Sequence, residues 1–187
     1  MKRLNRRVLS RLLVVAMLGL SAPAGAAGLE ATAQAKVDAK LQEIQGWAAD
    51  AAIVGAVRAY NAGKSPEAAA MDQNKWSSVS VIDPLVRGLT RNPAAEFLKG
   101  KKGEGVSEAF LSGADGGKVA FLGKPTNWSH QGKPKHQQPM SGKIWQGEVE
   151  VDESSGLQQV QVAVPVLDGG KPIGSLVVGL SVGMLGK

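Results

Sequence analysis

Cysteine is absent from this sequence of 187 residues, and aromatic residues are scarce, with four tryptophans, three phenylalanines and one tyrosine. Without cysteine the chain has no disulfide, no thiolate metal site, no covalent haem attachment and no lipoprotein anchor. The fold must therefore be held together by its apolar core alone, and a chain of this length is long enough to bury one. The length itself suits a single domain.

The motifs that mark common enzyme classes are also missing. The sequence has no Gly-x-Ser-x-Gly nucleophile elbow, no phosphate-binding loop and no dinucleotide fingerprint. The two histidines, His130 and His136, lie in a lysine-rich stretch with no carboxylate between Asp115 and Glu148, which is not a metal-ligand pattern. We interpret them as solvent-exposed loop histidines. The sequence predicts no catalytic residues, no metal site and no cofactor, and thus a protein that is not an enzyme.

Positive charge is concentrated at the N-terminus. The formal net charge is +6, but five Lys and Arg residues fall in the first eleven positions, ahead of the apolar run 12–20 and the small residues Ala24-Gly25-Ala26. This order is typical of a secretory signal peptide, and nine apolar residues are too few to span a bilayer comfortably. We predict a cleaved signal peptide at 1–26 and a periplasmic mature protein.

Without residues 1–26 the chain has 17 Lys and Arg against 16 Asp and Glu. A nearly neutral chain lacks the excess of basic residues that nucleic-acid-binding proteins use, so we expect no nucleic-acid partner. Two points stay open. Asn5-Arg6-Arg7-Val8-Leu9 loosely resembles a twin-arginine export signal, with ordinary secretion as the default, and an uncleaved signal peptide would anchor the protein in the membrane.

The last thirty residues, 157–186, alternate apolar and polar positions in two runs. Valine occupies every second position from 160 to 166, and Leu or Val every second position from 176 to 182. A period of two indicates strands with one buried face, and Asp168-Gly169-Gly170 between the runs favours a tight turn. We predict a long β-hairpin at the centre of a sheet, with Pro165 at an edge or a bulge because proline has no amide proton.

Further strands are predicted upstream. The stretches SEAFL (107–111) and KVAFL (118–122) flank a glycine-rich turn and indicate a second hairpin, and the alternation from Trp145 to Val151 indicates another strand. Between them, residues 123–143 are polar, with three prolines and no strand period. A segment of this length without structure of its own is usually functional or mobile. About five antiparallel strands are predicted in all.

The first part of the chain is predicted to be helical. Residues 29–62 lack proline and place apolar side chains at spacings of three and four, which indicates one long amphipathic helix that two internal glycines weaken without ending. We interpret its apolar stripe as core packing, and part of it is also suited to pair with a second copy. Short helices are predicted to start at Ser65-Pro66, running to about Lys75, and at Asp83-Pro84 and Asn92-Pro93.

The closing hairpin resembles that of a known family. VAVPVLDGGKPIGSLVVGL, residues 162–180, is similar to the last hairpin of extracellular Cache sensor domains, with its apolar strand, Pro-Val, Asp/Gly turn, Lys-x-Ile-Gly and second apolar strand. The family also begins with a long helix packed along a sheet. The resemblance implies an α+β, PAS-like fold in which a long N-terminal helix (27–62) and short helices (63–105) pack on an antiparallel sheet (106–187), all in one Cache-like domain, 27–187.

Cache domains bind small ligands, and residues 123–143 contain the main candidates for a pocket. Trp128 lies in an otherwise polar stretch, where it is either a lid packed on the core or a wall that a ligand touches. Thr126-Asn127-Trp128 also sits where the resemblance implies residues that border the pocket. For Trp145, core packing and pocket lining are both open. The predicted ligand-binding residues are Phe121, Thr126, Trp128, Lys143 and Trp145.

The distribution of charge predicts the class of ligand. Residues 87–143 carry ten Lys and Arg against four Asp and Glu, whereas 29–86 and 144–187 are both acidic. Positive charge around a cleft attracts anions, so a small carboxylate or similar anion is the expected ligand. Amino-acid-binding Cache domains have an aspartate in the final strand, but Gly179 stands there in this chain. Amino-acid recognition is therefore not carried over.

The function implied by the resemblance is sensing. We predict a periplasmic Cache-like domain, without transmembrane helices or an output domain of its own, that binds a small molecule and signals through a membrane sensor kinase or chemoreceptor. The alternative is an interaction module with no small ligand, which uses the long helix or a sheet edge. A homodimer through the N-terminal helix is compatible with both. The sequence leaves the ligand, the partner and the oligomeric state open.

Overall fold

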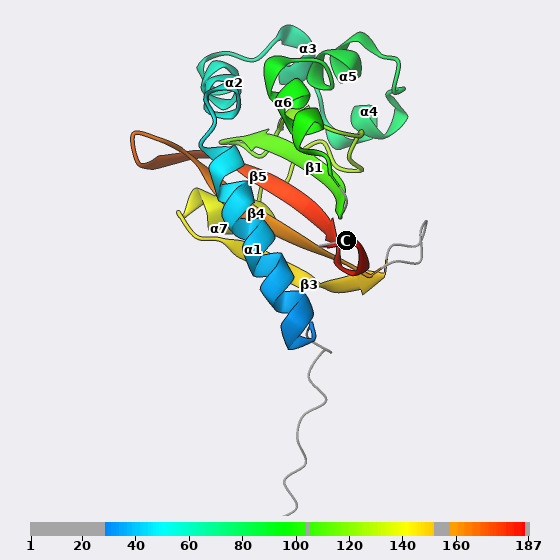
Figure 1. Cartoon of the computed structure of the whole chain (residues 1–187). Coiled ribbons are helices and arrows are strands. Elements are labelled where there is room, and N and C mark those ends of the chain that lie inside the picture. The colour runs from blue at the N-terminus through cyan, green and yellow to red at the C-terminus, as the bar shows by residue number, and fades with distance from the viewer. Residues whose placement is uncertain (1–28, 104, 152–157, 186–187) are drawn as a thin grey trace, which may run out of the picture.

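The computed structural model describes residues 29–103, 105–151 and 158–185, and the predicted signal peptide lies outside them. The α+β class expected from the sequence is confirmed: a five-stranded antiparallel sheet carries helices on both faces (Figure 1). In chain order the elements are α1 (Ala31–Ala48), α2 (Ala51–Ala62), α3 (Pro66–Ala69), α4 (Gln73–Ser78), α5 (Pro84–Leu89), α6 (Pro93–Lys101), β1 (Val106–Gly113), β2 (Lys118–Phe121), α7 (Pro134–Met140), β3 (Trp145–Val151), β4 (Gln158–Asp168), β5 (Lys171–Ser181) and the 3-10 helix η1 (Val182–Met184).

The closing hairpin lies in the middle of the sheet, as predicted. The strands follow the order β2-β1-β5-β4-β3, and every neighbouring pair is antiparallel. The turn between β4 and β5 contains Gly169 and Gly170, whose φ angles are 55° and 80°. Because these angles suit glycine far better than other residues, the Asp-Gly-Gly signal predicted the turn correctly.

Pro165 lies inside β4, opposite Ser175 of β5. On the other side of β4, the pairing with β3 reaches only as far as Ala163. The register of β4 against β5 shifts just beyond the proline, between Val166 and Leu167. The expectation of an edge or a bulge is thus confirmed, because β4 becomes an edge strand at this end and is irregular there.

The long helix predicted at the N-terminus is wrong in one respect, since it breaks into α1 and α2 at Asp50. Asp50 leaves the helical region, with φ −64° and ψ 142°, and its side chain accepts a hydrogen bond from the amide of Ala52. Aspartate favours helix starts because its carboxylate satisfies such amides. The break lets α1 cross the sheet while α2 turns towards the short helices (Figure 1).

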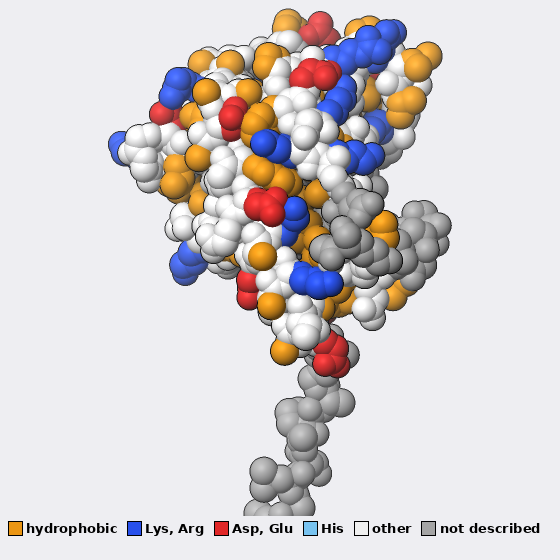
Figure 2. Space-filling model, viewed as in Figure 1, with side chains coloured by type: hydrophobic (Ala, Val, Ile, Leu, Met, Phe, Trp, Pro, Cys, Tyr) orange, Lys and Arg blue, Asp and Glu red, His pale blue; other side chains and the backbone are white. Residues whose placement is uncertain are grey.

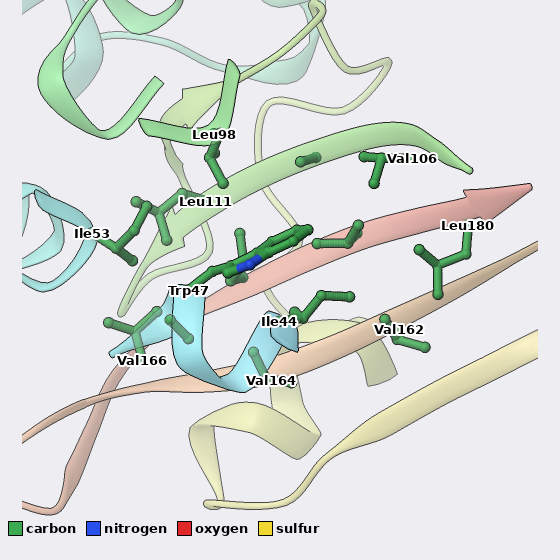
Figure 3. Packing of buried hydrophobic residues seen from close by; sticks show 14 of the residues in the cluster. Ile44, Trp47, Ile53, Leu98, Val106, Leu111, Val162, Val164, Val166 and Leu180 are labelled. Atoms are coloured by element: carbon green, nitrogen blue, oxygen red, sulfur yellow. The ribbon is translucent and has the colours of Figure 1, made fainter. Parts of the chain in front are cut away.

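The apolar stripe of these two helices packs on the sheet, as expected. Ile44 of α1 and Ile53 of α2 have no exposed surface and lie in one cluster with Leu98 of α6 and the inward residues of β1, β4 and β5. Figure 3 shows Ile44 and Trp47 between α1 and the strands, close to Val164. Core packing is confirmed for the stripe, and its pairing with a second copy stays a prediction.

The short helices follow their start signals, with one correction. Asp83 and Asn92 cap α5 and α6 by accepting hydrogen bonds from backbone amides. The helix predicted from Ser65 to Lys75 is instead two, α3 and α4, because Asp72 begins α4 by accepting from the amide of Lys75. Helices α2 to α6 form a cap beside the β1–β2 edge of the sheet (Figure 1).

Residues 123–143 were expected to lack structure of their own, and here the prediction is wrong. They contain α7, which packs on β4 and β5 on the face opposite α1. Pro134 occupies the first turn, where proline is tolerated, and Pro139 lies one residue before the end of this short helix. Of the helices described, none is both long and apolar enough to cross a bilayer.

Candidate functional site

One face of the sheet, covered by α7 and residues 122–133, holds most of the predicted ligand-binding residues. We call it the α7 face. Its apolar part is an aromatic cluster of Trp76, Phe121 and Trp128. The ring centroids of Trp76 and Trp128 are 5.1 Å apart, and those of Trp76 and Phe121 are 6.0 Å apart in an edge-to-face arrangement. The indole N–H of Trp76 donates to the carbonyl of Pro125 at 2.7 Å, which ties α4 to the covering segment.

Trp128 is a lid packed on the core. Only 6% of its surface is exposed, and its backbone amide donates to the side-chain oxygen of Gln73 at 2.9 Å. Trp76 and Phe121 lie against it on the inner side. The indole thus packs on the core as a lid would, and it also lines the open groove described below, so that its contact with a ligand stays a prediction.

The remaining predicted ligand-binding residues divide between this cluster and the surface. Phe121 is fully buried, and Trp145 is half-buried against the same cluster. Thr126 and Lys143 are exposed. The structure therefore brings Phe121, Trp128 and Trp145 together and leaves Thr126 and Lys143 outside.

The position of Trp145 depends on a bulge in β3. The register of β3 against β4 shifts between Gln146 and Val149. Trp145 is consequently opposite Ala163, which belongs to the aromatic side of the sheet, whereas Val149 is opposite Val160, which belongs to the core under α1. The regular alternation expected from Trp145 to Val151 is wrong at this point, because an inserted residue reverses the two faces of a strand.

Beside the aromatic cluster lies a polar cluster that the sequence did not predict, formed by Ser112, Lys118, His130, His136 and Ser175. Lys118 has no exposed surface. Its ammonium lies 2.7 Å from Nδ1 of His130 and donates to Oγ of Ser112 at 3.2 Å. Ser112 and Ser175 are directly opposite each other on β1 and β5, and Oγ of Ser175 lies 2.7 Å from Nδ1 of His136.

The expectation of solvent-exposed histidines is wrong. His130 and His136 are 4% and 3% exposed. The backbone amide of His130 donates to the carbonyl of Gly116 at 3.0 Å. The centroid of the His130 ring lies 4.8 Å from that of the Phe110 ring. His136 is turned inward by α7, where it shares the buried side of the helix with Pro139. This three-residue spacing was the one local signal for the burial of His136.

Burial sets the ionisation of the polar cluster. Burial and then the charge of Lys135 lower the pKa of Lys118 to about 7, although Asp115 and Glu108 oppose the change. Burial and then the charge of Lys118 lower the pKa of His130 to about 3. At neutral pH the imidazole of His130 is therefore uncharged, so its Nδ1 accepts a hydrogen bond from Lys118.

Lys135 adds a further cation to the α7 face. Its ammonium donates to Oε1 of Gln161, and the amide of Gln161 donates in turn to the carboxylate of Glu108. The ammonium groups of Lys118 and Lys135 lie 4.8 Å and 5.9 Å from the centroid of the Phe110 ring. Burial lowers the pKa of Lys135, and it also lowers that of His136. Four basic side chains thus surround one small region.

An open groove of about 420 Å³ lies outside Trp128, on the surface of the covering segment. Its charged members are Asp72, which caps α4, and Asp115, which is paired with Lys64. The rest of the lining offers amides, a hydroxyl and a thioether. The groove is lined by Met71, Asp72, Gln73, Asp115, Asn127, Trp128, Ser129 and Gln131.

The basic middle of the sequence does not gather at this groove. Arg87 and Arg91 lie at and just after α5, and Lys99, Lys101 and Lys102 lie in and just after α6, all exposed. Figure 2 shows Lys and Arg side chains over this upper part of the molecule. Only some of the basic residues of 87–143 therefore lie on the α7 face, namely those of the polar cluster and Lys135.

The contact between His136 and Ser175 has the spacing of a base and a nucleophile. Ser175 has no exposed surface, however, and Nε2 of His136 lies 3.2 Å from the carbonyl of Ala114 rather than from a carboxylate. This pair joins α7 to β5 and the β1–β2 turn. Within the described ranges, His, Asp and Glu do not gather in groups of three or more that would hold a metal ion.

Comparison with known proteins gave matches only among solved structures. No family model matches the chain. No curated protein matches it either.

The solved structures that match include sensor domains. They include the ligand-binding domain of the Pseudomonas aeruginosa amino-acid chemoreceptor PctC with GABA (13% identity, 80% of this chain, 55% of that one, TM-score 0.45). Another is the sensor domain of the Vibrio cholerae histidine kinase DctB (15% identity, 81% of this chain, 52% of that one, TM-score 0.44). A third is the ligand-binding domain of the Campylobacter jejuni chemoreceptor Tlp3 with 4-methylisoleucine (13% identity, 80% of this chain, 54% of that one, TM-score 0.39). The chain spans about half the length of these domains.

Proposed function

We propose that this protein is a periplasmic sensory domain. It binds a small anion, foremost a carboxylate, at the polar cluster on the α7 face, and it passes the binding event to a membrane sensor kinase or chemoreceptor. The proposal joins two independent observations. One is the Cache-like closing hairpin in the sequence, and the other is the group of basic side chains that the fold gathers beneath α7.

The observation that carries the proposal is the environment of the Lys118 ammonium. It is fully buried, and the groups within hydrogen-bonding distance are Oγ of Ser112, the carbonyl of Gly116 and the neutral imidazole of His130. Burying an ammonium costs free energy unless an anion accompanies it. A ligand carboxylate would supply that countercharge, and Lys135 would be near enough to share it.

On the α7 face His130 covers Lys118, with Nδ1 of its ring 2.7 Å from the ammonium, so an anion that approaches from this face must displace the covering segment. Binding and movement of residues 122–133 and α7 are therefore coupled. Since α7 packs on β4 and β5 at the centre of the sheet, a shift of this short helix is a means of changing the surface that a partner contacts.

A thermal-shift screen tests the proposal. The panel contains aliphatic and aromatic carboxylates, with amines, nucleobases and neutral sugars as other classes. A ligand at a hundredfold excess over its Kd stabilises the folded state by about 2.7 kcal/mol, which a melting curve resolves. We expect a carboxylate to raise the Tm of the wild type and to lose this effect in Lys118→Met.

Lys124→Met is the matched control. The ammonium of Lys124 also contacts the aromatic residues, donating to the carbonyl of Trp76 at 2.8 Å, but it lies outside the polar cluster. The control should keep the ligand-induced shift. The proposal fails if no carboxylate in the panel raises the Tm, or if the shift persists in Lys118→Met.

Export is part of the proposal and has its own measurement. The mature protein recovered from the periplasmic fraction of an expressing bacterium should begin at Ala27, as intact mass spectrometry would report. Recovery of the chain with residues 1–26 still attached, in the membrane fraction, would contradict a cleaved signal peptide.

A second candidate function, an interaction module without a small ligand, is favoured by a different observation. Trp128 is packed against Trp76, and exposed apolar residues lie at the two ends of the edge strand β3. Ile144, just before the strand, is 42% exposed, and Val151, its last residue, is 61% exposed. An edge strand is able to pair with another chain. Native mass spectrometry of the exported protein separates the two functions. A dimer without ligand that Val151→Lys converts to monomer supports the module, and a co-purified small molecule supports the sensor.

A further inference from the structure

A second hollow, of about 560 Å³, lies in the helical cap between α2, α5 and the start of β2. One wall is a row of small residues on α2, at positions 51, 52, 55, 56 and 59. The facing wall contains Leu85 and Leu89 of α5, and the buried part of the lining includes Ala68 and Val119. We call this hollow the cap groove. Its volume lies in the range of small-molecule sites, and its lining is mostly apolar, as in such sites.

The cap groove differs in charge from the hollow beside it. Its charged lining residues are Lys64 and Lys118, and the described lining contains no carboxylate. Asp115, the ion-pair partner of Lys64, is not part of the lining. A neighbouring hollow shares Ser65, Leu85 and Leu89 with the cap groove and is lined by Glu67 and Asp83.

Gly55 is the residue that keeps the cap groove open in the middle of α2. A Cβ atom at this position would have no heavy atom within 4 Å, so close packing does not demand glycine there. A glycine in a helix interior costs about 1 kcal/mol relative to alanine. Any side chain at this position would project into space that belongs to the groove.

We propose that the cap groove binds a small amphipathic anion, namely a medium-chain alkyl carboxylate. The alkyl chain lies between the small residues of α2 and the leucines of α5, where it is removed from water. The carboxylate lies at Lys64, whose ammonium has three N–H groups and so has donors beyond the one that bonds Asp115. Glu67 and Asp83 disfavour an anionic head in the neighbouring hollow.

The cap groove is distinct from the site proposed on the α7 face. Trp128 and His130 do not belong to its lining, which comes mainly from α2 and α5, and Lys118 is the one residue of the polar cluster in it. Lys118 lies between the two sites, with its ammonium directed to His130 and Ser112. The experiments therefore use Gly55 and Lys64, which line the groove and do not belong to the polar cluster.

Isothermal titration with decanoate tests the groove. Gly55→Leu should weaken binding of decanoate by about tenfold or more, because the new side chain occupies the path of the alkyl chain. Gly46→Leu is the matched control: position 46 of α1 also has nothing within 4 Å of a Cβ atom, but it is not part of the lining. Both substitutions raise helix propensity, so both variants should fold.

The head group has a separate test. Lys64→Gln should weaken decanoate several-fold and leave decanol unchanged, whereas Lys40→Gln, which removes another surface ion pair, should change neither. The proposal is overturned if the wild type does not bind decanoate at millimolar concentration, if Gly55→Leu binds it normally, or if decanol binds as tightly as decanoate.

Discussion

Lys118 and His130 are joined by a buried hydrogen bond, and both contribute to how the stability of the protein depends on pH. Both groups would carry a proton in an unfolded chain at moderately acid pH. In the folded protein Nζ of Lys118 lies 2.7 Å from Nδ1 of His130, and burial disfavours a charge on either side chain. The consequence is a folded state that holds fewer protons than the unfolded one over two separate ranges of pH.

The effect at acid pH comes from the lowered pKa of His130. Its pKa is lowered from 6.5 to about 3, so between these values the unfolded chain binds a proton that the folded chain excludes. Stability is therefore complete above about pH 6.5 and falls as the pH drops towards 3. His130→Gln keeps an acceptor for Lys118 but does not titrate, so the loss of stability between pH 6.5 and 4 should become shallower. Urea unfolding at several pH values measures this slope, and an unchanged slope would contradict the assignment.

The effect at alkaline pH comes from the lowered pKa of Lys118. Its pKa falls from 10.5 to about 7, so a carboxylate bound next to it should raise that pKa again. At pH 8 ligand binding should then be accompanied by proton uptake, and affinity should fall as the pH rises above 7. Titration calorimetry in two buffers of different ionisation enthalpy detects the proton. The absence of uptake at pH 8 would place the ligand away from Lys118, and Lys118→Met is the variant that should show none.

At the scale of elements, α7 and the break between α1 and α2 decide which residues meet. Without the break a single helix would run past the edge of the sheet, and the cap would lose α2. Without α7, His136 would have no means of reaching Ser175. Both features depend on single residues at a helix start, Asp50 in the first case and Pro134 in the second.

Asp50→Ala tests the break. The substitution removes the oxygen that accepts the amide of Ala52, at 2.8 Å, and should lower the free energy of unfolding by about 1 kcal/mol. Asp38→Ala is a suitable comparison, because Asp38 is exposed in the interior of α1 and caps no helix. Its effect on urea unfolding should be within about 0.5 kcal/mol of zero. Equal effects of the two variants would show that the cap contributes nothing.

At the scale of the whole molecule, one sheet separates two different interiors. The side under α1 is uniformly apolar, whereas the α7 face combines aromatic residues with buried basic groups. The first interior supplies stability, because its side chains need no partner beyond each other. The second is suited to binding, because its polar groups retain the capacity to exchange one partner for another.

Substitutions in the apolar interior should therefore act on stability alone. Ile44→Ala removes a fully buried side chain between α1 and the sheet and should lower the free energy of unfolding by about 2–5 kcal/mol. Ile82→Ala, at a position that is 74% exposed, should change it by less than about 0.5 kcal/mol. Chemical denaturation of both variants checks the contrast, which vanishes if α1 does not pack as described.

The sequence by itself determined the strands of the closing hairpin, the turn at Gly169 and Gly170, and the starts of α5 and α6. Each of these is set by a local pattern, a period of two or a capping residue, that acts within a few positions of the chain. The tertiary structure alone decided that Trp128 closes on the core and that Lys118 and His130 are buried. His136 meets Ser175 from 39 residues away, and no local pattern records such a contact, because the burial of a polar side chain depends on partners that only the fold brings to it.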